Sequence, residues 1–248
     1  MSTTRQDPSS AARRRRLWRV GALGVLAAAL AAVLATLATS GSTSDLRPGR
    51  PVPGASATLA LLRGVPQEGS ALGSASAPVT LVEFGDLQCP GCADFATGAL
   101  PSIVATFVRD GRVRVVFRAL DYIGADSTRA ARMAYALGVQ DRMFEFIELA
   151  YRNEGLENSS YVTDTYLRAL ASAIPGVDVA RALAERTGAD VKAQLAQSRA
   201  LAARLHIAST PSFLLYRSGS APRRFQPEGL DAGSFRGPIE RLLAGAAA

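Results

Sequence analysis

The sequence of 248 residues predicts an α/β fold for three reasons. A short apolar run rich in β-branched residues, 79–84, is typical of a central strand covered on both faces. The block 126–205 has almost wholly helical apolar spacing. Strand character returns just after Pro211, and a helical pattern closes the chain. Strand, helix, strand, helical insertion, two strands and a helix is an α/β arrangement.

Most of the net charge lies in residues 1–19. Six arginines and one aspartate place +5 of the formal +7 there, so the rest of the chain carries +2. No basic patch with interleaved aromatic residues follows, and we therefore expect no nucleic-acid partner. We interpret 1–19 as a basic cytoplasmic tail.

An uncharged run of mostly Ala, Leu, Val and Gly follows at 20–38. At about 1.5 Å per residue it approaches the ~30 Å hydrocarbon thickness of a bilayer. Arginines on its N-terminal side place the N-terminus inside and the bulk of the chain outside. We predict a single-pass anchor over 20–39 in the cell membrane, with a signal peptide cleaved near Ala38 or a buried core helix as alternatives. Export by either route puts the remaining chain in an oxidising compartment.

The next segment is predicted to be a tether. Residues 40–56 are rich in Ser, Gly and Pro and show no apolar period, so we expect a flexible linker over 40–63. The folded domain is then expected to occupy 64–248.

Within that domain the elements follow in order. A helix is expected after Pro90, which lacks an N–H where a first helical position needs none, and Pro101 should kink or break it near its middle. Alternation predicts a strand at 112–120. Four or five helices should fill the insertion at 126–205, with Asp126 or Ser127, Thr163 and Asp190 as the candidate caps. The last elements are expected as strands at 212–216 and 224–226 and a helix at 232–243.

Cys89 and Cys92 are the only cysteines, separated by Pro90 and Gly91. One pair across so short a loop would stabilise the fold little, so reactivity is the better reason for it. Because Pro90 marks Cys89 as the helix cap, the helix N-terminus should favour its thiolate, and Cys92, one turn further in, should resolve intermediates. A closed zinc site takes four ligands, and with His206 as the sole histidine zinc would require a dimer, so we predict no metal.

Together these motifs resemble a known family. Residues 77–84, the Cys89–Cys92 motif and Ser209-Thr210-Pro211-Ser212-Phe213 resemble the DsbA-like branch of the thioredoxin superfamily over about 64–243. The resemblance implies a thioredoxin fold with an inserted helical subdomain and no cofactor beyond the redox-active cysteine pair. It also implies a cis Thr210-Pro211 bond beside the cysteines, where the Thr210 backbone would pair with an extended substrate.

Two positions need separate interpretation. Glu83 is an acid inside an apolar strand. In one interpretation its side chain tips toward solvent. In the other, which the family's tendency to place an acid here favours, it is buried and relays a proton to or from Cys92. Gly91 departs from the family, whose well-known oxidising members carry histidine there. We therefore expect a less stabilised Cys89 thiolate and a weaker oxidant.

The sequence and the resemblance together predict a thiol-disulfide oxidoreductase outside the cytoplasm. Its expected partners are exported proteins with thiols and a membrane reoxidant such as DsbB or a vitamin-K-epoxide-reductase homologue. Reduction or isomerisation of disulfides is the close alternative, and a chaperone-like module that binds clients is another. No dimerisation domain is apparent, so we predict a monomer.

Overall fold

The structure of this chain is a computed structural model that describes residues 46–245; the predicted tail and anchor over 1–39 lie outside them. The described strands are β1 (Gln67–Glu68), β2 (Ala71–Leu72), β3 (Val79–Asp86), β4 (Val113–Leu120), β5 (Ser212–Arg217) and β6 (Arg224–Phe225). The helices are α2 (Ala55–Leu62), α3 (Pro90–Thr97), α4 (Ala99–Ile103), α5 (Ala125–Gly138), α6 (Met143–Arg152), α7 (Asp164–Ser172), α8 (Val179–Glu185), α9 (Ala189–Arg204) and α10 (Ala232–Leu243), with a π-helical turn, η2 (Val104–Val108), after α4.

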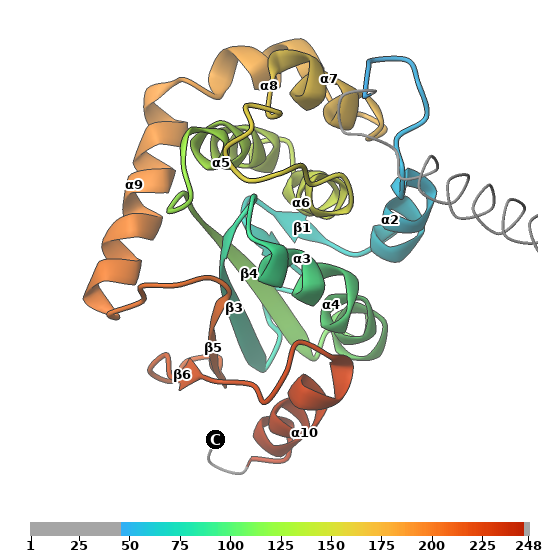
Figure 1. Cartoon of the computed structure of the whole chain (residues 1–248). Helices are drawn as coiled ribbons and strands as arrows, with labels where there is room; N and C mark the ends of the chain where they lie inside the picture. The colour runs from blue at the N-terminus through green and yellow to red at the C-terminus, as the bar shows by residue number, and fades with distance from the viewer. Residues whose placement is uncertain (1–45, 246–248) are drawn as a thin grey trace, which may run out of the picture. The chain divides into compact units, whose positions relative to one another are not determined.

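The sheet is mixed and has β3 near its centre (Figure 1). Its strand order is β1-β2-β4-β3-β5-β6. β3 pairs in parallel with β4 and antiparallel with β5, so every residue of β3 is buried. Burial on both faces explains why the strand is mostly apolar rather than alternating, as the sequence predicts.

The two faces of the sheet are covered by different helices. Leu81 and Leu215 belong to the main core, which also contains buried residues of α3, α4, α6 and α10. Val82 and Leu214, on the other face, pack in a smaller cluster with Ala202 near the end of α9. Because side chains alternate along a strand, Glu83 shares the face of Leu81, toward α3 and not toward solvent.

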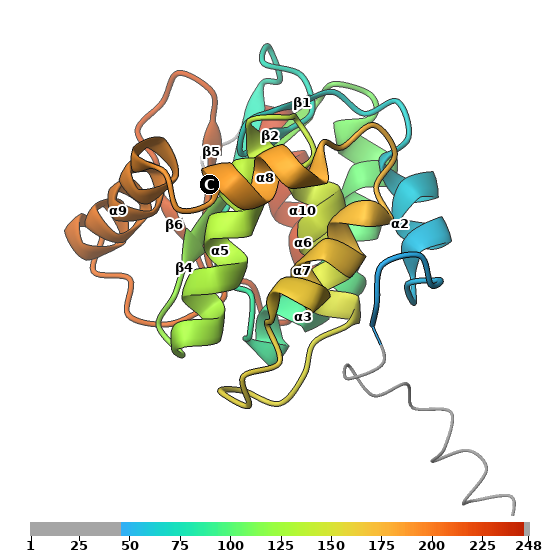
Figure 2. The ribbon, with the colours of Figure 1, turned by 90° about the horizontal axis from the view of Figure 1, so that it is seen from above.

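Helices α5 to α9 form the helical insertion between β4 and β5, as predicted (Figures 1 and 2). The Thr163 side chain accepts a hydrogen bond from the N–H of Tyr166 and caps α7, also as predicted. The caps predicted at Asp126 or Ser127 and at Asp190 are wrong, because α5 and α9 begin earlier, with Gly124 and Gly188 as their N-cap residues. α6 packs against α3 and α5, while α9 packs against α5 and β4. The insertion therefore contacts the motif helix α3 through α6.

The flexible linker predicted over 40–63 is wrong for most of its described part. Residues 55–62 form α2, which packs on α6, and Leu62 is 3% exposed. Asn153 at the end of α6 donates from Nδ2 to the carbonyl of Pro53 at 3.0 Å, which fixes the chain just before α2. Only Thr58 and Leu62 are buried in α2, too few to give an apolar period in the sequence.

The helix after the motif breaks at Gly98, near its middle but three residues before Pro101. A Cβ at Gly98 would lie 2.7 Å from the Asp94 carbonyl oxygen and 3.1 Å from that of Leu230, so close backbone approach requires glycine there. Pro101 then falls in the first turn of α4, where its missing N–H costs no helical bond.

By length and composition, one described helical run, Pro90–Val108, is apolar enough to cross a membrane. Half of it is buried in the domain, and core helices satisfy the same criterion.

Candidate active site

Cys89 is the N-cap residue of α3, with extended backbone (φ −92°, ψ 115°) and Pro90 at the first helical position. Its carbonyl accepts the N–H groups of Cys92 at 2.9 Å and Ala93 at 3.1 Å, which begin the helix. No side chain caps this end of α3. The N–H groups of Gly91 and Cys92 in the first turn therefore reach the Cys89 sulfur, as the cap prediction requires.

The Thr210-Pro211 bond is cis, as the resemblance implied, and lies beside the motif. Cys89 Sγ donates to the Thr210 carbonyl oxygen at 3.4 Å, although the two residues are 121 positions apart. A Cβ at Gly91 would lie 3.1 Å from Pro211 Cδ and 3.9 Å from Cys89 Sγ. The fold thus brings Cys89, Gly91, Thr210 and Pro211 together at one edge of the domain core.

The two thiols have opposite electrostatic environments. The pKa of Cys89 is lowered to about 6, and a hydrogen bond from the Cys92 thiol is the largest cause. Burial opposes this lowering, whereas hydrogen bonds from the Thr210 side chain and from the N–H groups of Cys92 and Gly91 add to it. Burial raises the pKa of Cys92, which is fully buried, well above its ordinary value. At pH 7 a thiol of pKa about 6 is about nine-tenths thiolate. Of the two sulfurs, Cys89 therefore forms the thiolate and Cys92 remains a thiol.

Glu83 is buried, 2% exposed, and lies opposite Phe117 of β4 and Phe213 of β5. Burial is the largest cause that raises its pKa well above the usual range, and the charges of Glu148 and Cys89 add to it. Its charge in turn helps to raise the pKa of Cys92. The solvent-facing interpretation of Glu83 is therefore wrong: the carboxyl is buried, its burial favours the protonated form, and it is electrostatically coupled to Cys92.

Tyr151 of α6 is a site residue that the sequence did not indicate. Its buried hydroxyl donates to the Asp86 carbonyl at 3.3 Å and is hydrogen-bonded with the Cys92 thiol. A Cβ at Gly85 would lie 2.9 Å from this hydroxyl and 3.0 Å from Glu83 Oε1, so glycine lets both groups approach the same point. Tyr151 fits the apolar face of its helix, and no sequence signal distinguishes it from a core aromatic residue.

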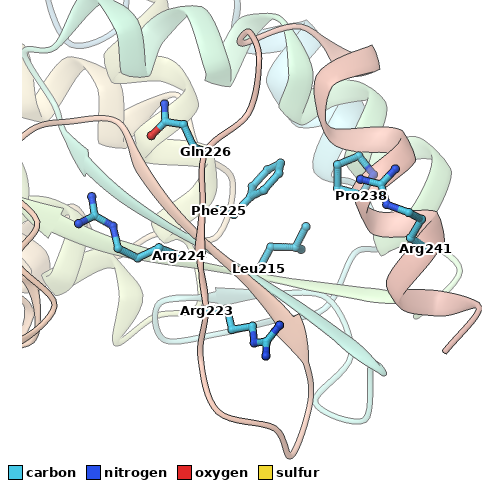
Figure 3. A pocket seen from close by; sticks show the side chains of 7 residues that line it. All are labelled: Leu215, Arg223, Arg224, Phe225, Gln226, Pro238 and Arg241. Atoms are coloured by element: carbon cyan, nitrogen blue, oxygen red, sulfur yellow. The ribbon is translucent and has the colours of Figure 1, made fainter. Parts of the chain in front are cut away.

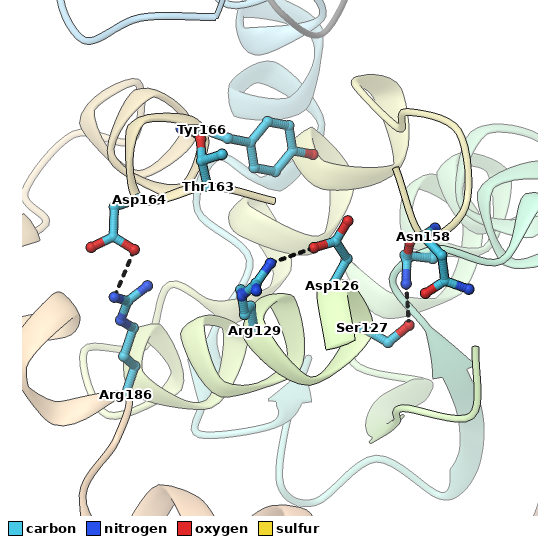
Figure 4. Close-up of polar contacts among 9 residues, drawn as sticks. Asp126, Ser127, Arg129, Asn158, Thr163, Asp164, Tyr166 and Arg186 are labelled. Atoms are coloured by element: carbon cyan, nitrogen blue, oxygen red, sulfur yellow. Dashed lines mark hydrogen bonds and ion pairs between the residues drawn. The ribbon is translucent and has the colours of Figure 1, made fainter. Parts of the chain in front are cut away.

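The loop after α6 is fixed to the motif region. The Asn158 N–H donates to Gln88 Oε1 at 2.8 Å, and Gln88 Nε2 donates to Ser127 Oγ at 2.8 Å. Figure 4 shows Ser127 and Asn158 side by side at the start of α5. Within this loop the pKa of Glu154 is raised to about 8, first by burial and then by the Cys89 charge. The loop therefore places an acidic group, also unpredicted, near the nucleophile.

Figure 4 also shows two ion pairs among the helices of the insertion. Asp126 pairs with Arg129 at 2.6 Å, and Asp164 in the first turn of α7 pairs with Arg186 at 2.8 Å. The first pair lies within α5 and the second joins α7 to the end of α8, and neither contains a residue of the motif.

A pocket of about 250 Å³ lies away from the motif, between the β5–β6 edge and α10 (Figure 3). Apolar and arginine side chains line it, with Arg224 Nη1 donating to the His206 carbonyl at 3.2 Å. Its lining residues are Leu215, Arg223, Arg224, Phe225, Gln226, Pro238 and Arg241. None of them belongs to the cysteine motif.

No group of three or more His, Cys, Asp or Glu side chains within residues 46–245 has the arrangement of a metal site. Both cysteines are free thiols in the structure. The chemistry that this geometry supports is thiol-disulfide exchange through Cys89.

Comparison with known proteins agrees with the fold. The family model described as Thioredoxin matches residues 66–218. A probable disulfide bond formation protein D of Bacillus cereus is 29% identical over 144 residues, 57% of this chain and 67% of that protein. Disulfide bond formation protein D of Bacillus subtilis is 32% identical over 102 residues, but the match spans 40% of this chain and 46% of that protein.

Solved structures show the same architecture. Oxidised BdbD of Bacillus subtilis superimposes with a TM-score of 0.63 at 23% identity, over 73% of this chain and 98% of that one. A thioredoxin-like oxidoreductase of Silicibacter pomeroyi gives a TM-score of 0.55 at 27% identity, over 77% of this chain and 98% of that one. The mixed sheet, the helical insertion and the matched family model agree, and the chain therefore belongs to the thioredoxin family as a DsbA-like member.

Proposed function

We propose that this protein is an extracytoplasmic thiol-disulfide oxidoreductase that introduces disulfides into exported proteins through Cys89 and Cys92. One observation carries the proposal: a thiolate-forming Cys89 at a helix N-terminus lies against the Thr210 carbonyl of a cis-proline loop, with a buried Cys92 behind it. The relatives named disulfide bond formation protein D support the same activity.

The reaction starts from the Cys89–Cys92 disulfide. A substrate thiolate attacks Cys89 Sγ, the bond between the two cysteine sulfurs breaks, and its electron pair leaves on Cys92, which takes a proton. A second substrate thiolate then attacks the substrate sulfur of the mixed disulfide and releases Cys89 as a thiolate. The substrate loses two electrons to form its disulfide, and the cysteine pair gains them.

The environments of the two cysteines favour these steps. Because the pKa of Cys89 is about 6, it is a good leaving group in the second attack. Because the pKa of Cys92 is raised, its leaving thiolate takes a proton at neutral pH, and the coupled Glu83 carboxyl is the proposed donor. Once protonated, Cys92 no longer attacks the mixed disulfide on Cys89.

The substrate is proposed to bind as an added strand beside the cis-proline loop. The half-buried Thr210 offers its backbone next to Cys89, and Pro211 and Gly91 border the same point. Pro90 holds the first turn of α3 in position behind the nucleophile. The protein would then select its substrates mainly by an extended, unfolded backbone with a free thiol.

The N-terminal predictions complete the proposal. Residues 1–19 would be a cytoplasmic tail and 20–39 a single-pass anchor, with the domain on the outer side of the membrane. A membrane reoxidant of the DsbB or vitamin-K-epoxide-reductase type would then be within reach of Cys89 and return the pair to the disulfide. The monomeric state remains part of this proposal.

The experiment is covalent trapping in cells. In Cys92→Ser the mixed disulfide formed by Cys89 has no resolving thiol in the chain, so substrate complexes should accumulate and disappear on reduction. The double variant Cys89→Ser/Cys92→Ser is the matched control. Alkylation of the wild-type protein in cells should find the pair mainly oxidised; a mainly reduced pair would favour the reductase or isomerase alternative, and no trapped partner would favour a client-binding module.

A further inference from the structure

We propose that Glu148 and Arg152 of α6 form the outer half of a proton route that connects Cys92 and Glu83 with solvent beside α2. This inference rests on the proposed function, because only turnover of the cysteine pair requires Cys92 to gain and lose a proton. It adds to that function two residues that lie outside the cysteine motif and the cis-proline loop.

Two carboxyl groups are buried in the core where α6 meets β3. Glu148 is fully buried and Glu83 is 2% exposed, and each has an Oε1 without a hydrogen-bond partner among residues 46–245. Tyr151, one turn after Glu148 on α6, brings its hydroxyl to 2.9 Å from the Gly85 Cβ position that is 3.0 Å from Glu83 Oε1, and the charge of Glu148 acts on Glu83. Apolar residues would fill this space at lower cost, and stability therefore gives no reason for a pair of buried acids.

The outer end of the route is an ion pair. Arg152 Nη2 lies 3.3 Å from Glu148 Oε2, and the Arg152 side chain is 25% exposed. Its stem lies against Gly54, where an added Cβ would be 2.5 Å from Arg152 Cδ. Gly54, with φ 78°, precedes α2, which carries no ionisable side chain. A proton on Glu148 thus lies one side chain away from solvent.

Glu83 requires such a connection. Because burial raises the pKa of Glu83, its carboxyl favours the protonated form, and a protonated carboxyl must release its own proton before it can accept the one from Cys92. Glu83 has almost no contact with solvent, but Glu148, whose charge acts on it, is paired with the partly exposed Arg152.

Glu148 is suited to pass a proton in both directions. Burial raises its pKa to about 7, while the Arg152 charge opposes the rise. At neutral pH the protonated and ionised forms are then about equally populated, the condition in which a relay group works best. Within the described chain, Arg152 from its own helix is the charged group that acts on Glu148. The charge of Glu148 in turn raises the pKa of Glu83 on β3, which is coupled to Cys92 and Tyr151.

The test isolates the step that needs the proton of Cys92. Reduced protein is mixed with glutathione disulfide: the Cys89 thiolate forms a mixed disulfide and releases one glutathione thiolate, and Cys92 then loses its proton, attacks Cys89 Sγ and expels the second. Acid quenching and mass spectrometry give the decay rate of the mixed disulfide as a function of pH. Glu148→Gln should slow this decay about tenfold at neutral pH and flatten its pH profile near 7, and Glu148→Asp should restore part of the rate.

Glu145→Gln is the matched control, because Glu145 lies on the same helix, is also buried, and is held by Gln67 Nε2 at 2.7 Å. It should leave the decay within about twofold of wild type. Arg152→Met gives an independent check: without the guanidinium the pKa of Glu148 rises, so the midpoint of the pH profile should move upward. Thermal unfolding of each variant verifies that the fold is intact.

Wild-type decay rates for Glu148→Gln at every pH would overturn the route, as would equal slowing in Glu148→Gln and Glu145→Gln. Slow decay in Glu83→Gln together with normal decay in Glu148→Gln would limit the relay to Glu83. A wild-type protein that forms no mixed disulfide at all would refute the proposed function itself, so the two failures are distinguishable.

Discussion

Replacing Gly91 with histidine should lower the pKa of Cys89 further and make the disulfide a stronger oxidant. Gly91 contributes no side chain beside the nucleophile, and a Cβ placed there would be 3.9 Å from Cys89 Sγ. An imidazolium on that Cβ would stabilise the thiolate in addition to the hydrogen bonds from Cys92 and Thr210 that already act on it.

The size of the effect follows from this geometry. With the ring charge about 6 Å from the sulfur and an effective dielectric constant of about 20 to 40, Coulomb's law gives roughly 1.4 to 2.8 kcal/mol. That energy corresponds to about one to two pKa units, so the pKa of Cys89 should fall from about 6 to roughly 4 to 5. Each unit of thiolate stabilisation raises the reduction potential by about 30 mV in a two-electron couple.

Ultraviolet absorbance of the thiolate during a pH titration measures the pKa, and equilibration with glutathione measures the potential. Gly91→Ala is the matched control, because any side chain at 91 brings the same Cβ 3.1 Å from Pro211 Cδ. The difference between the histidine and alanine variants therefore isolates the ring. Equal pKa values in the two variants would refute the electrostatic reasoning, and a wild-type pKa of about 3.5, the value of strongly oxidising members, would refute the weaker-oxidant prediction.

Three further predictions concern the relay and the fold. Glu83→Gln should slow the steps that protonate or deprotonate Cys92. Because the raised pKa of Glu83 makes the folded state bind a proton that the unfolded state releases above about pH 4.5, the substitution should also reduce the fall in urea stability as pH rises above that value, leaving the part due to Glu148 and Glu154; an unchanged slope would contradict the burial argument. Leu62→Ala should lower the free energy of unfolding by about 2 to 5 kcal/mol if α2 is part of the core, whereas the exposed Ser56→Ala should not; equal stabilities would restore the linker interpretation. Thr163→Ala should cost about 1 kcal/mol in the same urea assay by removing the cap of α7, and a loss below a few tenths would mean that the Tyr166 N–H finds another partner.

The main strands and the insertion could be predicted because their patterns are strong. The central strand extends two residues beyond the predicted 79–84, since Gly85 and Asp86 still pair with β4 although they break the apolar run. The final helix, Ala232–Leu243, has the predicted bounds. β1 and β2 have two residues each, too few for any alternation to appear, and their pairing is decided by the neighbouring β4.

The candidate site could be predicted only where local sequence encodes it. Pro90 marks the start of α3 and so the position of Cys89, but the cis Thr210-Pro211 bond came from the family resemblance alone. Tyr151 and Glu148 could not be found, because their roles depend on contacts between α6 and β3 that no spacing within the helix reveals. Their helical pattern indicates only that the face is buried.

Reaction of the oxidised protein with a reduced dithiol peptide tests the central claim most directly. Mass spectrometry of acid-quenched samples should show one peptide disulfide formed for each Cys89–Cys92 pair reduced. Peptide mapping should place the intermediate mixed disulfide on Cys89, with none on Cys92. An intermediate on Cys92, or a peptide that remains reduced while the protein remains oxidised, would contradict the account.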